Sequence, residues 1–138
     1  MKNKKSPQEF AFHFLSFRSR SEKEMRDYLK KKEVLEIDET IGKLKELDFI
    51  NDNKFVQEFI DSRSKNKPKG KKALMIELAR KGIKVDNLDI NEDELAKKAL
   101  LKKKTFKDRN QLQRFLYSRG FSSSVIERAV KAWYNKEE

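Results

Sequence analysis

Apolar residues recur along this chain every three or four positions, the spacing of one face of an α-helix, and no segment shows sustained alternation. In three places, two apolar residues four apart are followed five positions later by one closing apolar residue. The three copies are Met25-x-x-x-Leu29 with Val34, Leu74-x-x-x-Leu78 with Ile83, and Leu112-x-x-x-Leu116 with Phe121. A period of about 40 to 50 residues predicts a tandem helical repeat whose units bury their apolar faces against their neighbours.

Signals for helix ends support this register. Gly82 and Gly120 stand directly before the closing residues of the second and third copies, where a helix stops on a residue of left-handed conformation. The first copy has Glu33 at that position, which predicts a less sharp stop. The predicted starts of the three helices are Ser21 with Glu24, Pro68–Gly70, and Asp108 with Gln111.

The same periodicity predicts the remaining helices. They span about 8–18, 21–32, 38–47, 51–61, 71–82, 91–104, 108–118 and 122–134, with Asp38 capping the third and a polar linker over 62–70. Residues 84–90 are too few and too polar for a full helix, so the second unit is expected to be shortened. We predict an all-α fold of tandem three-helix repeats over 8–50, 51–90 and 91–135, stacked into an elongated array.

The net charge of the chain indicates which kind of partner it binds. Charged residues make up 41% of the chain, and 34 basic against 23 acidic side chains give a net charge of +11. Such an excess favours a polyanion or an acidic protein surface, although a merely soluble lysine-rich protein has the same composition. With no cysteine in the sequence, disulfides and thiolate metal sites are excluded.

Membrane insertion and export are not predicted. The apolar stretch 10–17 is too short to span a bilayer and is interrupted by His13 and Ser16. The basic opening 1–5 is not followed by an apolar run with a cleavage site, so a cytoplasmic protein is expected. The charged segments at the two ends, 2–5 and 136–138, favour a monomer.

No constellation of residues predicts catalysis. His13, the only histidine, lies among phenylalanines and is expected to be a packing residue. Acidic residues are scattered beside basic ones on helix faces, as in Glu22 with Arg26 and Glu77 with Lys81, where pairing four positions apart explains them. Glycine-rich phosphate loops, nucleophile elbows and zinc-ligand spacings are all absent from the sequence. We therefore expect no enzyme activity and no cofactor.

Basic residues cluster where the first helix of each unit ends. The clusters are Arg18 with Arg20, Arg63 with Lys65, and Lys102–Lys104. Cations at helix C-termini also neutralise the helix dipole, so any one cluster has a structural explanation. The stretch 62–81 adds weight, since it holds eight basic residues against the single acidic Glu77. The phenylalanines fall at core spacings, so a surface for stacking on bases is not expected.

Several short motifs together resemble the RecX family of recombinase regulators. They occur in the family's order and span about residues 10–134. The motifs are Ser19-Arg20-Ser21-Glu22-Lys23-Glu24-Met25-x-x-x-Leu29, Leu47-Asp48-Phe49-Ile50-Asn51-Asp52, Phe55-x-x-x-Phe59-x-x-x-Arg63, Lys69-Gly70 with Leu78-x-x-Lys81-Gly82-Ile83, and Phe115-Leu116-x-x-Arg119-Gly120-Phe121. Glu33 departs from the family, which usually has glycine there, and so does the shortened second unit.

The resemblance implies a curved stack of three-helix repeats that binds the RecA filament on single-stranded DNA. It also implies restraint of strand exchange, ATP hydrolysis and co-protease activity. Transferred by position, the filament- or DNA-binding residues would be Arg18, Arg20, Arg63, Lys65, Lys69, Lys71 and Arg80, in front of a scaffold of Phe49, Phe55 and Phe59.

Two other functions stay open. Three-helix units joined by short turns are also used by independent DNA- or RNA-binding proteins, although here the exposed positions are mostly Lys and Glu, which do not specify bases. An adaptor that only bridges proteins is the third possibility, and weak salt dependence of binding would distinguish it.

Overall fold

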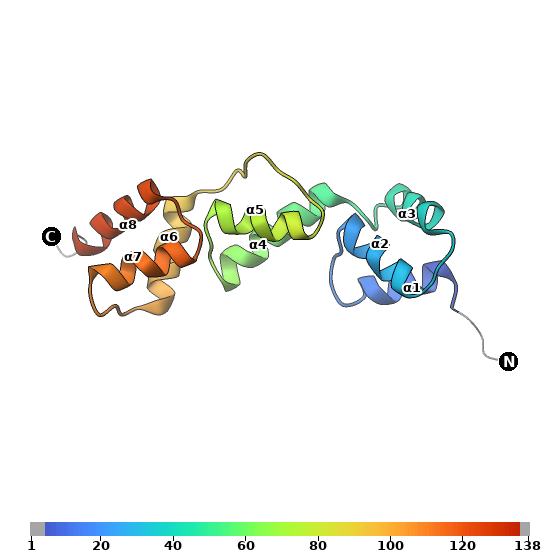
Figure 1. The fold of residues 1–138 in the computed structure, drawn as a ribbon, viewed down its shortest axis with the longest axis horizontal. Helices are drawn as coiled ribbons and strands as arrows, with labels where there is room; N and C mark the ends of the chain where they lie inside the picture. Colours follow the sequence, from blue (N-terminus) through green and yellow to red (C-terminus); the bar gives the residue numbers. More distant parts are fainter. Residues whose placement is uncertain (1–4, 136–138) are drawn as a thin grey trace. The chain divides into compact units, whose positions relative to one another are not determined.

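The computed structural model describes residues 5–135, and over this range α-helices joined by loops are the only regular secondary structure (Figure 1). The helices are α1 (Pro7–Leu15), α2 (Glu22–Lys31), α3 (Ile37–Glu46), α4 (Asp52–Asn66), α5 (Lys71–Arg80), α6 (Glu92–Lys103), α7 (Arg109–Ser118) and α8 (Ser123–Asn135). The predicted all-α fold is confirmed. The chain ends 1–4 and 136–138, on which the expectation of a monomer rests, lie outside the described residues.

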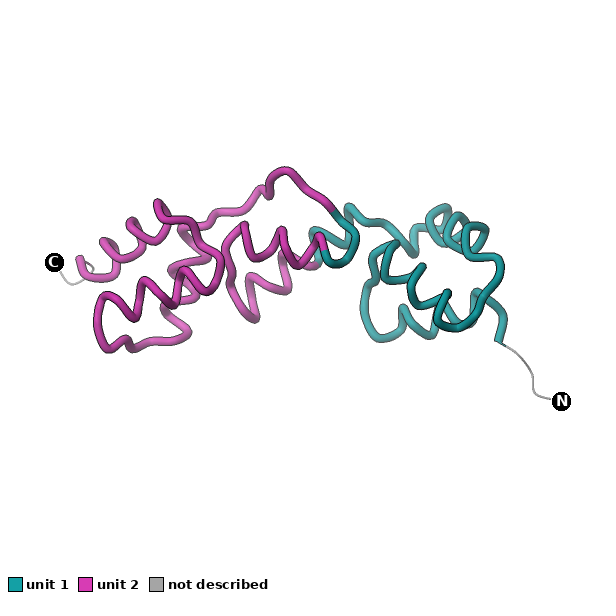
Figure 2. The backbone as a smooth tube through the Cα atoms, in the orientation of Figure 1, with its two compact units in different colours: residues 1–58, 80–83 teal, residues 59–79, 84–138 magenta. Residues whose placement is uncertain are grey.

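Two compact units divide the chain, the first formed by residues 1–58 and 80–83, the second by 59–79 and 84–138 (Figure 2). The boundary between them runs through α4 and α5. The repeat bounds at residues 50 and 90 therefore stay a prediction.

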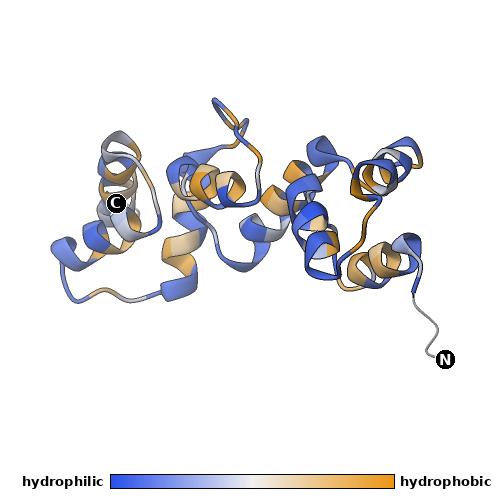
Figure 3. Cartoon of the chain, turned by 45° about the vertical axis from the view of Figure 1, so that its right-hand side comes forward, coloured by the Kyte–Doolittle hydropathy of each residue, from blue (hydrophilic) through white to orange (hydrophobic). Residues whose placement is uncertain are grey.

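Helices α1, α2 and α3 enclose the core of unit 1. Met25 and Leu29, the apolar pair of the first repeat, are fully buried. The other buried members are Ala11, Ile41, Leu44 and Ile50, and partly buried side chains pack around them. Figure 3 shows the apolar positions of these helices on the faces that turn toward one another. The helical spacing of hydrophobic residues thus correctly identifies the core.

Helices α6, α7 and α8 enclose the main core of unit 2. Leu112 and Leu116 are fully buried there, and the closing residue Phe121 is buried beside them. The remaining buried members are Leu95, Ala96, Ala99, Leu100, Val125, Ile126 and Val130. Truncating a fully buried leucine such as Leu116 to alanine costs about 2–5 kcal/mol.

Most predicted helix starts are confirmed. The Ser21 hydroxyl accepts the Glu24 amide at 3.2 Å, and the Glu24 carboxylate accepts the Ser21 amide at 3.0 Å, which completes a capping box. Asp108 accepts the Gln111 amide at 2.8 Å at the start of α7. The predicted cap at Asp38 is wrong, because α3 begins at Ile37 and Asp38 lies in its first turn, paired with Arg26 at 2.6 Å.

The second repeat differs from the other two as the sequence predicts. No helix lies between the end of α5 at Arg80 and the start of α6 at Glu92, so its third helix is absent. The predicted linker 62–70 is too long, because α4 continues to Asn66. Only residues 67–70 connect α4 to α5.

The helix stops of the three repeats share one backbone conformation. Glu33, Gly82 and Gly120 all have positive φ angles, of 60°, 81° and 84°. After Glu33 the Val34 amide donates to the Leu29 carbonyl at 3.0 Å, as the Phe121 amide donates to Leu116 at 3.3 Å. The expectation of a less sharp stop at Glu33 is therefore wrong, since the backbone adopts the glycine conformation with a non-glycine residue.

In unit 2, the end of α7 meets the start of α5 by direct backbone contact. The Gly70 amide donates to the Arg119 carbonyl at 2.8 Å. A Cβ on Gly70 would lie 2.3 Å from the Gly120 carbonyl oxygen, and a Cβ on Gly120 would lie 2.5 Å from that of Ala73. Glycine is required at both positions because the two backbone segments leave no space for a side chain between them.

Unit 1 contains a similar junction between residues 80–83 and the start of α2. The Ser21 hydroxyl donates to the Lys81 carbonyl at 2.7 Å, although the two residues are 60 positions apart. A Cβ on Gly82 would lie 2.5 Å from that of Lys23. In both units the carbonyl end of one helix therefore meets the amide end of an earlier one, an arrangement that opposite helix-dipole charges favour.

The conformation of Glu33 gives a stability prediction. Replacing Glu33 with glycine should raise the free energy of unfolding by about 0.5–1 kcal/mol, because relief of left-handed strain exceeds the added entropy of the unfolded chain. Urea unfolding followed by circular dichroism measures the change. As a control, Lys32→Gly at the preceding residue, where φ is −85°, should destabilise by a similar amount. Equal effects of the two substitutions would contradict this explanation.

Candidate binding surface

The seven predicted contact residues lie in both units. Arg18, Arg20 and Arg80 belong to unit 1, and the other four, Arg63, Lys65, Lys69 and Lys71, belong to unit 2. Four of the seven side chains are held by close local partners. The other three have no ion pair within the described residues and are more available for binding.

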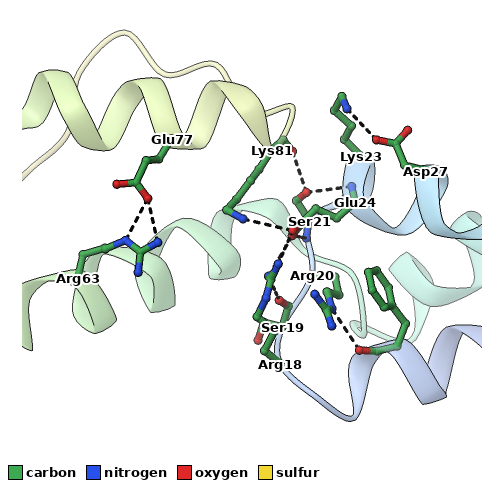
Figure 4. A network of polar contacts seen from close by, with 11 residues as sticks. Arg18, Ser19, Arg20, Ser21, Lys23, Glu24, Asp27, Arg63, Glu77 and Lys81 are labelled. Atoms are coloured by element: carbon green, nitrogen blue, oxygen red, sulfur yellow. Dashed lines mark hydrogen bonds and ion pairs between the residues drawn. The ribbon is translucent and has the colours of Figure 1, made fainter. Parts of the chain in front are cut away.

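In unit 1, the Glu24 carboxylate forms ion pairs with two cationic side chains (Figure 4). The Arg18 guanidinium donates to both of its carboxylate oxygens, through Nη1 at 3.2 Å and Nη2 at 2.5 Å. The Lys81 ammonium lies 3.3 Å from Oε2. Only 16% of the Glu24 side chain is exposed. Glu24 thus links the loop before α2, the cap of α2 and residues 80–83.

The surroundings of Glu24 strongly favour its charged form. Burial by itself raises the pKa of a carboxyl, but hydrogen bonds from Arg18 and the Ser21 amide, with the charges of Arg18 and Lys81, lower the pKa of Glu24 to about 2. Glu24 therefore remains ionised at physiological pH.

Arg20 is held by aromatic stacking. Its guanidinium lies 3.7 Å from the centre of the Phe14 ring, and its Nε donates to the Phe14 carbonyl at 3.1 Å. Phe14 in turn stacks on Tyr28, with ring centres 4.0 Å apart. Burial, together with the neighbouring charge of Arg18, lowers the pKa of Arg20 from its usual value. This side chain is fixed in place beside the loop that leads into α2.

In unit 2, Glu77 has a comparable role between α4 and α5. The Arg63 guanidinium donates to its Oε2 through Nε at 3.1 Å and Nη2 at 2.9 Å, and also lies over the Phe59 ring. The Lys69 ammonium reaches Oε1 at 2.6 Å. Burial raises the pKa of Glu77, but the hydrogen bonds from Lys69 and Arg63 outweigh it and lower the pKa overall. The single acidic residue of the stretch 62–81 thus neutralises two of its cations.

The other three predicted residues are more available. Lys65 and Arg80 are exposed, and neither forms an ion pair with a residue in the described range 5–135. Lys71 is half-buried in the first turn of α5, where its backbone amide, and not its ammonium, donates to Glu92 at 3.1 Å. Its ammonium group has no ion-pair partner in the same range.

The third basic cluster contributes to the fold of unit 2. The Lys102 ammonium donates to the Lys65 and Asn66 carbonyls at 2.6 and 2.9 Å, which caps the end of α4. Lys103 lies over the rings of Phe106 and Phe115. The interaction of a cation with free carbonyls at a helix end explains Lys102.

The role of the phenylalanines as a scaffold stays a prediction, and the structure tests only their burial. Phe55 and Phe59 are buried, but Phe49 is 50% exposed and contacts Phe12 edge to face. Phe17, which the predicted helix over 8–18 includes at a core spacing, lies beyond the end of α1 and is exposed. His13 is exposed against Phe17. The periodicity misplaces these rings because they lie where the three-helix core ends.

The described residues contain no group of three or more side chains suited to hold a metal ion. Over the same range, none of the helices combines the length and apolar character needed to cross a bilayer. The arrangement provides a charged surface for binding, with structural carboxylates that hold part of the charge.

Comparison with known proteins agrees with this architecture. The family models described as the first and third three-helix domains of RecX match residues 9–44 and 92–130. Regulatory protein RecX of Oceanobacillus iheyensis is 34% identical over 143 residues, which cover 91% of this chain. The chain belongs to the RecX family. Regulatory protein RecX of Bacillus velezensis is 37% identical over 140 residues, covering 88% of this chain.

Solved RecX structures share the fold. A crystal structure of RecX from Lactobacillus salivarius aligns with a TM-score of 0.66 at 25% identity, covering 88% of this chain and 90% of that one. A second, described as regulatory protein RecX, aligns with a TM-score of 0.71 at 26% identity, covering 92% of this chain and 69% of that one. The chain spans about half the length of the curated relatives, 53% for the Oceanobacillus protein and 52% for the Bacillus velezensis one.

The depressed pKa of Glu24 makes stability depend on pH. A pKa of about 2 in the folded state, against an ordinary 4.5, stabilises the fold fully above about pH 4.5, and this stabilisation is lost as the pH falls toward 2. Glu24→Gln keeps an acceptor for the Ser21 amide but removes the charge. At pH 7 it should cost about 1–2 kcal/mol after solvent screening, and the difference from the natural chain should shrink below pH 4.5.

Urea unfolding between pH 7 and pH 3 measures this difference. Glu46→Gln is a matched control, since Glu46 is exposed and forms no ion pair within residues 5–135. It should change the free energy of unfolding by less than about 0.5 kcal/mol. A Glu24→Gln effect that stays constant across this pH range would show that the carboxylate charge is not responsible.

Proposed function

We propose that this RecX protein binds the filament that RecA forms on single-stranded DNA and inhibits its recombinase, ATPase and co-protease activities. It would act as a cytoplasmic monomer without a cofactor, in the control of homologous recombination, DNA repair and the SOS response. The observation that carries the proposal is the match of two RecX domain types, first and third, in order along one chain.

The charge of the chain supports this partner. A RecA filament on DNA presents phosphate groups and a protein surface, and a net charge of +11 favours association with such a polyanion. Available cations occur in both units, at Arg80 in unit 1 and at Lys65 and Lys71 in unit 2.

Within the proposed surface the seven cations have two roles. Lys65, Lys71 and Arg80 would contact the filament with their free charges. Arg18, Arg20, Arg63 and Lys69 would contact it with the part of each side chain that its local partner does not occupy, as in Arg18, whose side chain is 45% exposed. Because Glu24 fixes Arg18, Phe14 fixes Arg20, and Glu77 fixes Arg63 and Lys69, these four would bind as preorganised groups.

The DNA-dependent ATPase of the cognate RecA tests the proposal. Titration of this protein from well below equal stoichiometry should lower the rate while most of the DNA remains unoccupied by it, as a parallel anisotropy assay on bare DNA would show. Inhibition that appears only when the protein saturates the DNA would mean competition for DNA and would overturn filament binding. An unchanged rate at equal stoichiometry would overturn inhibition.

Charge reversal tests the contact residues. The double variant Lys65→Glu/Arg80→Glu should raise the concentration needed for half inhibition several-fold, because both side chains are exposed and free of ion pairs in the described range. The control Lys31→Glu/Lys43→Glu has the same net charge and changes exposed lysines of α2 and α3. Equal effects of both variants would mean that only total charge matters. Arg63 and Lys69 are less suitable, since their reversal would place three carboxylates together at Glu77.

A further inference from the structure

Helices α7 and α8 of unit 2 form a groove of 710 Å³ that neither the family comparison nor the proposed contacts explain. Both helices are held by the core around Leu112 and Leu116, and they pack directly on each other (Figure 1). Ile126 and Val130, which belong to the same core, also line the groove. Its walls are therefore fixed by packing.

The groove carries a local excess of positive charge. Arg109, Arg114 and Lys131 line it, against the single carboxylate of Glu127. None of the three cations forms an ion pair with any residue from 5 to 135, in contrast to Arg63 or Arg18. Cations without an ion-pair partner can bind an anionic group without first breaking a salt bridge.

Two exposed tyrosines stand among these cations. Tyr117 on α7 is 74% exposed and Tyr134 on α8 is 44% exposed. The Arg109 guanidinium lies over the Tyr134 ring, 4.8 Å from its centre. Large aromatic faces left in solvent beside unpaired arginines are typical of surfaces that stack on nucleobases and contact phosphates.

Tyr117 also lines a second hollow of unit 2, which lies along α5. That hollow contains Lys71, Lys72 and Lys84, opposed by Asp86 and Glu92. The ring therefore stands between two basic depressions, so a strand that stacks a base on Tyr117 has cations on both sides for its phosphates.

We propose that the α7–α8 groove binds single-stranded nucleic acid, with bases stacked on Tyr117 and Tyr134 and phosphates held by Arg109, Arg114 and Lys131. Gln113 and Asn135, which also line the groove, offer amide donors and acceptors to the base edges. An acidic peptide would use the cations but not the exposed ring faces. A duplex keeps its base faces stacked internally, which removes the contact that the tyrosines offer.

None of the residues that line the α7–α8 groove is a proposed filament contact, although Lys71 lines the adjoining hollow, and binding in the groove needs no recombinase. The test therefore uses the full chain and a labelled oligothymidine of about 15 nucleotides, without RecA, in a fluorescence anisotropy titration at several salt concentrations. A failure to bind oligothymidine would not affect the ATPase test of filament binding. A failure of the ATPase test would likewise not affect the binding of oligothymidine in the groove.

Two sets of variants separate stacking from charge. Tyr117→Ala should weaken oligothymidine binding roughly tenfold, while Tyr117→Phe, which keeps the ring, should bind as the natural chain does. Arg114→Glu/Lys131→Glu should weaken binding at least as much and make the slope of log affinity against log salt shallower by about 1.4, for two phosphate contacts. Circular dichroism verifies that each variant keeps its helix content.

The control Lys30→Glu/Lys31→Glu changes exposed lysines of α2 in unit 1 and has the same net charge as the second variant. It should retain most of the affinity. Equal loss in both charge variants, or an effect of Tyr117→Ala below twofold, would overturn the proposal by reducing the binding to general electrostatics. Equal affinity for a duplex of the same sequence, or binding of polyglutamate in place of oligothymidine, would overturn it as well.

Discussion

The close approach of helix ends, where no side chain fits, is the constraint on which the rest of the structure depends. Gly70 and Gly120 meet in unit 2, and Gly82 meets Lys23 in unit 1. In each case a carbonyl at a helix end accepts a hydrogen bond from the beginning of an earlier helix. These contacts use backbone groups that a helix end leaves without partners. Within each unit they join helix ends through backbone contact, which is consistent with a chain whose charged fraction is 41%.

Charged side chains also connect parts of the structure. Glu24 and Glu77 each neutralise two cations and connect segments that the helical cores do not join. A basic chain folded in this way separates its positive side chains into those that hold the structure and those that remain on the surface. The distinction matters for function, because the basic stretch 62–81 is less available to a partner than its composition indicates. The unpaired cations beside Tyr117 and Tyr134 were not marked by any comparable density in the sequence.

Local features of the fold were predictable from the sequence, and long-range pairings were not. Capping boxes, the buried pair Met25 and Leu29, and the missing third helix of the second repeat depend on neighbours within a few residues, so their patterns are visible in one dimension. The partners of Arg63 and Lys81 lie 14 and 57 positions away and follow only from the packing of helices. The prediction that Phe49 is buried is wrong for a related reason. Its spacing fits a buried helix face, but the core of unit 1 ends before Phe49 and leaves its side chain half exposed. Tyr117 and Tyr134 carry no sequence signal that separates them from packed rings.

The bond between Ser21 and Lys81 has a consequence for the order in which the protein folds as it is synthesised. The core residues of unit 1 up to Ile50 leave the ribosome well before residues 80–83, which complete that unit. The first three helices can therefore collapse early, but the start of α2 waits for a segment 60 residues downstream. Unit 1 therefore reaches its final form only after α4 and α5 have been translated, and it can do so before the helices α6, α7 and α8 that enclose the main core of unit 2 are complete.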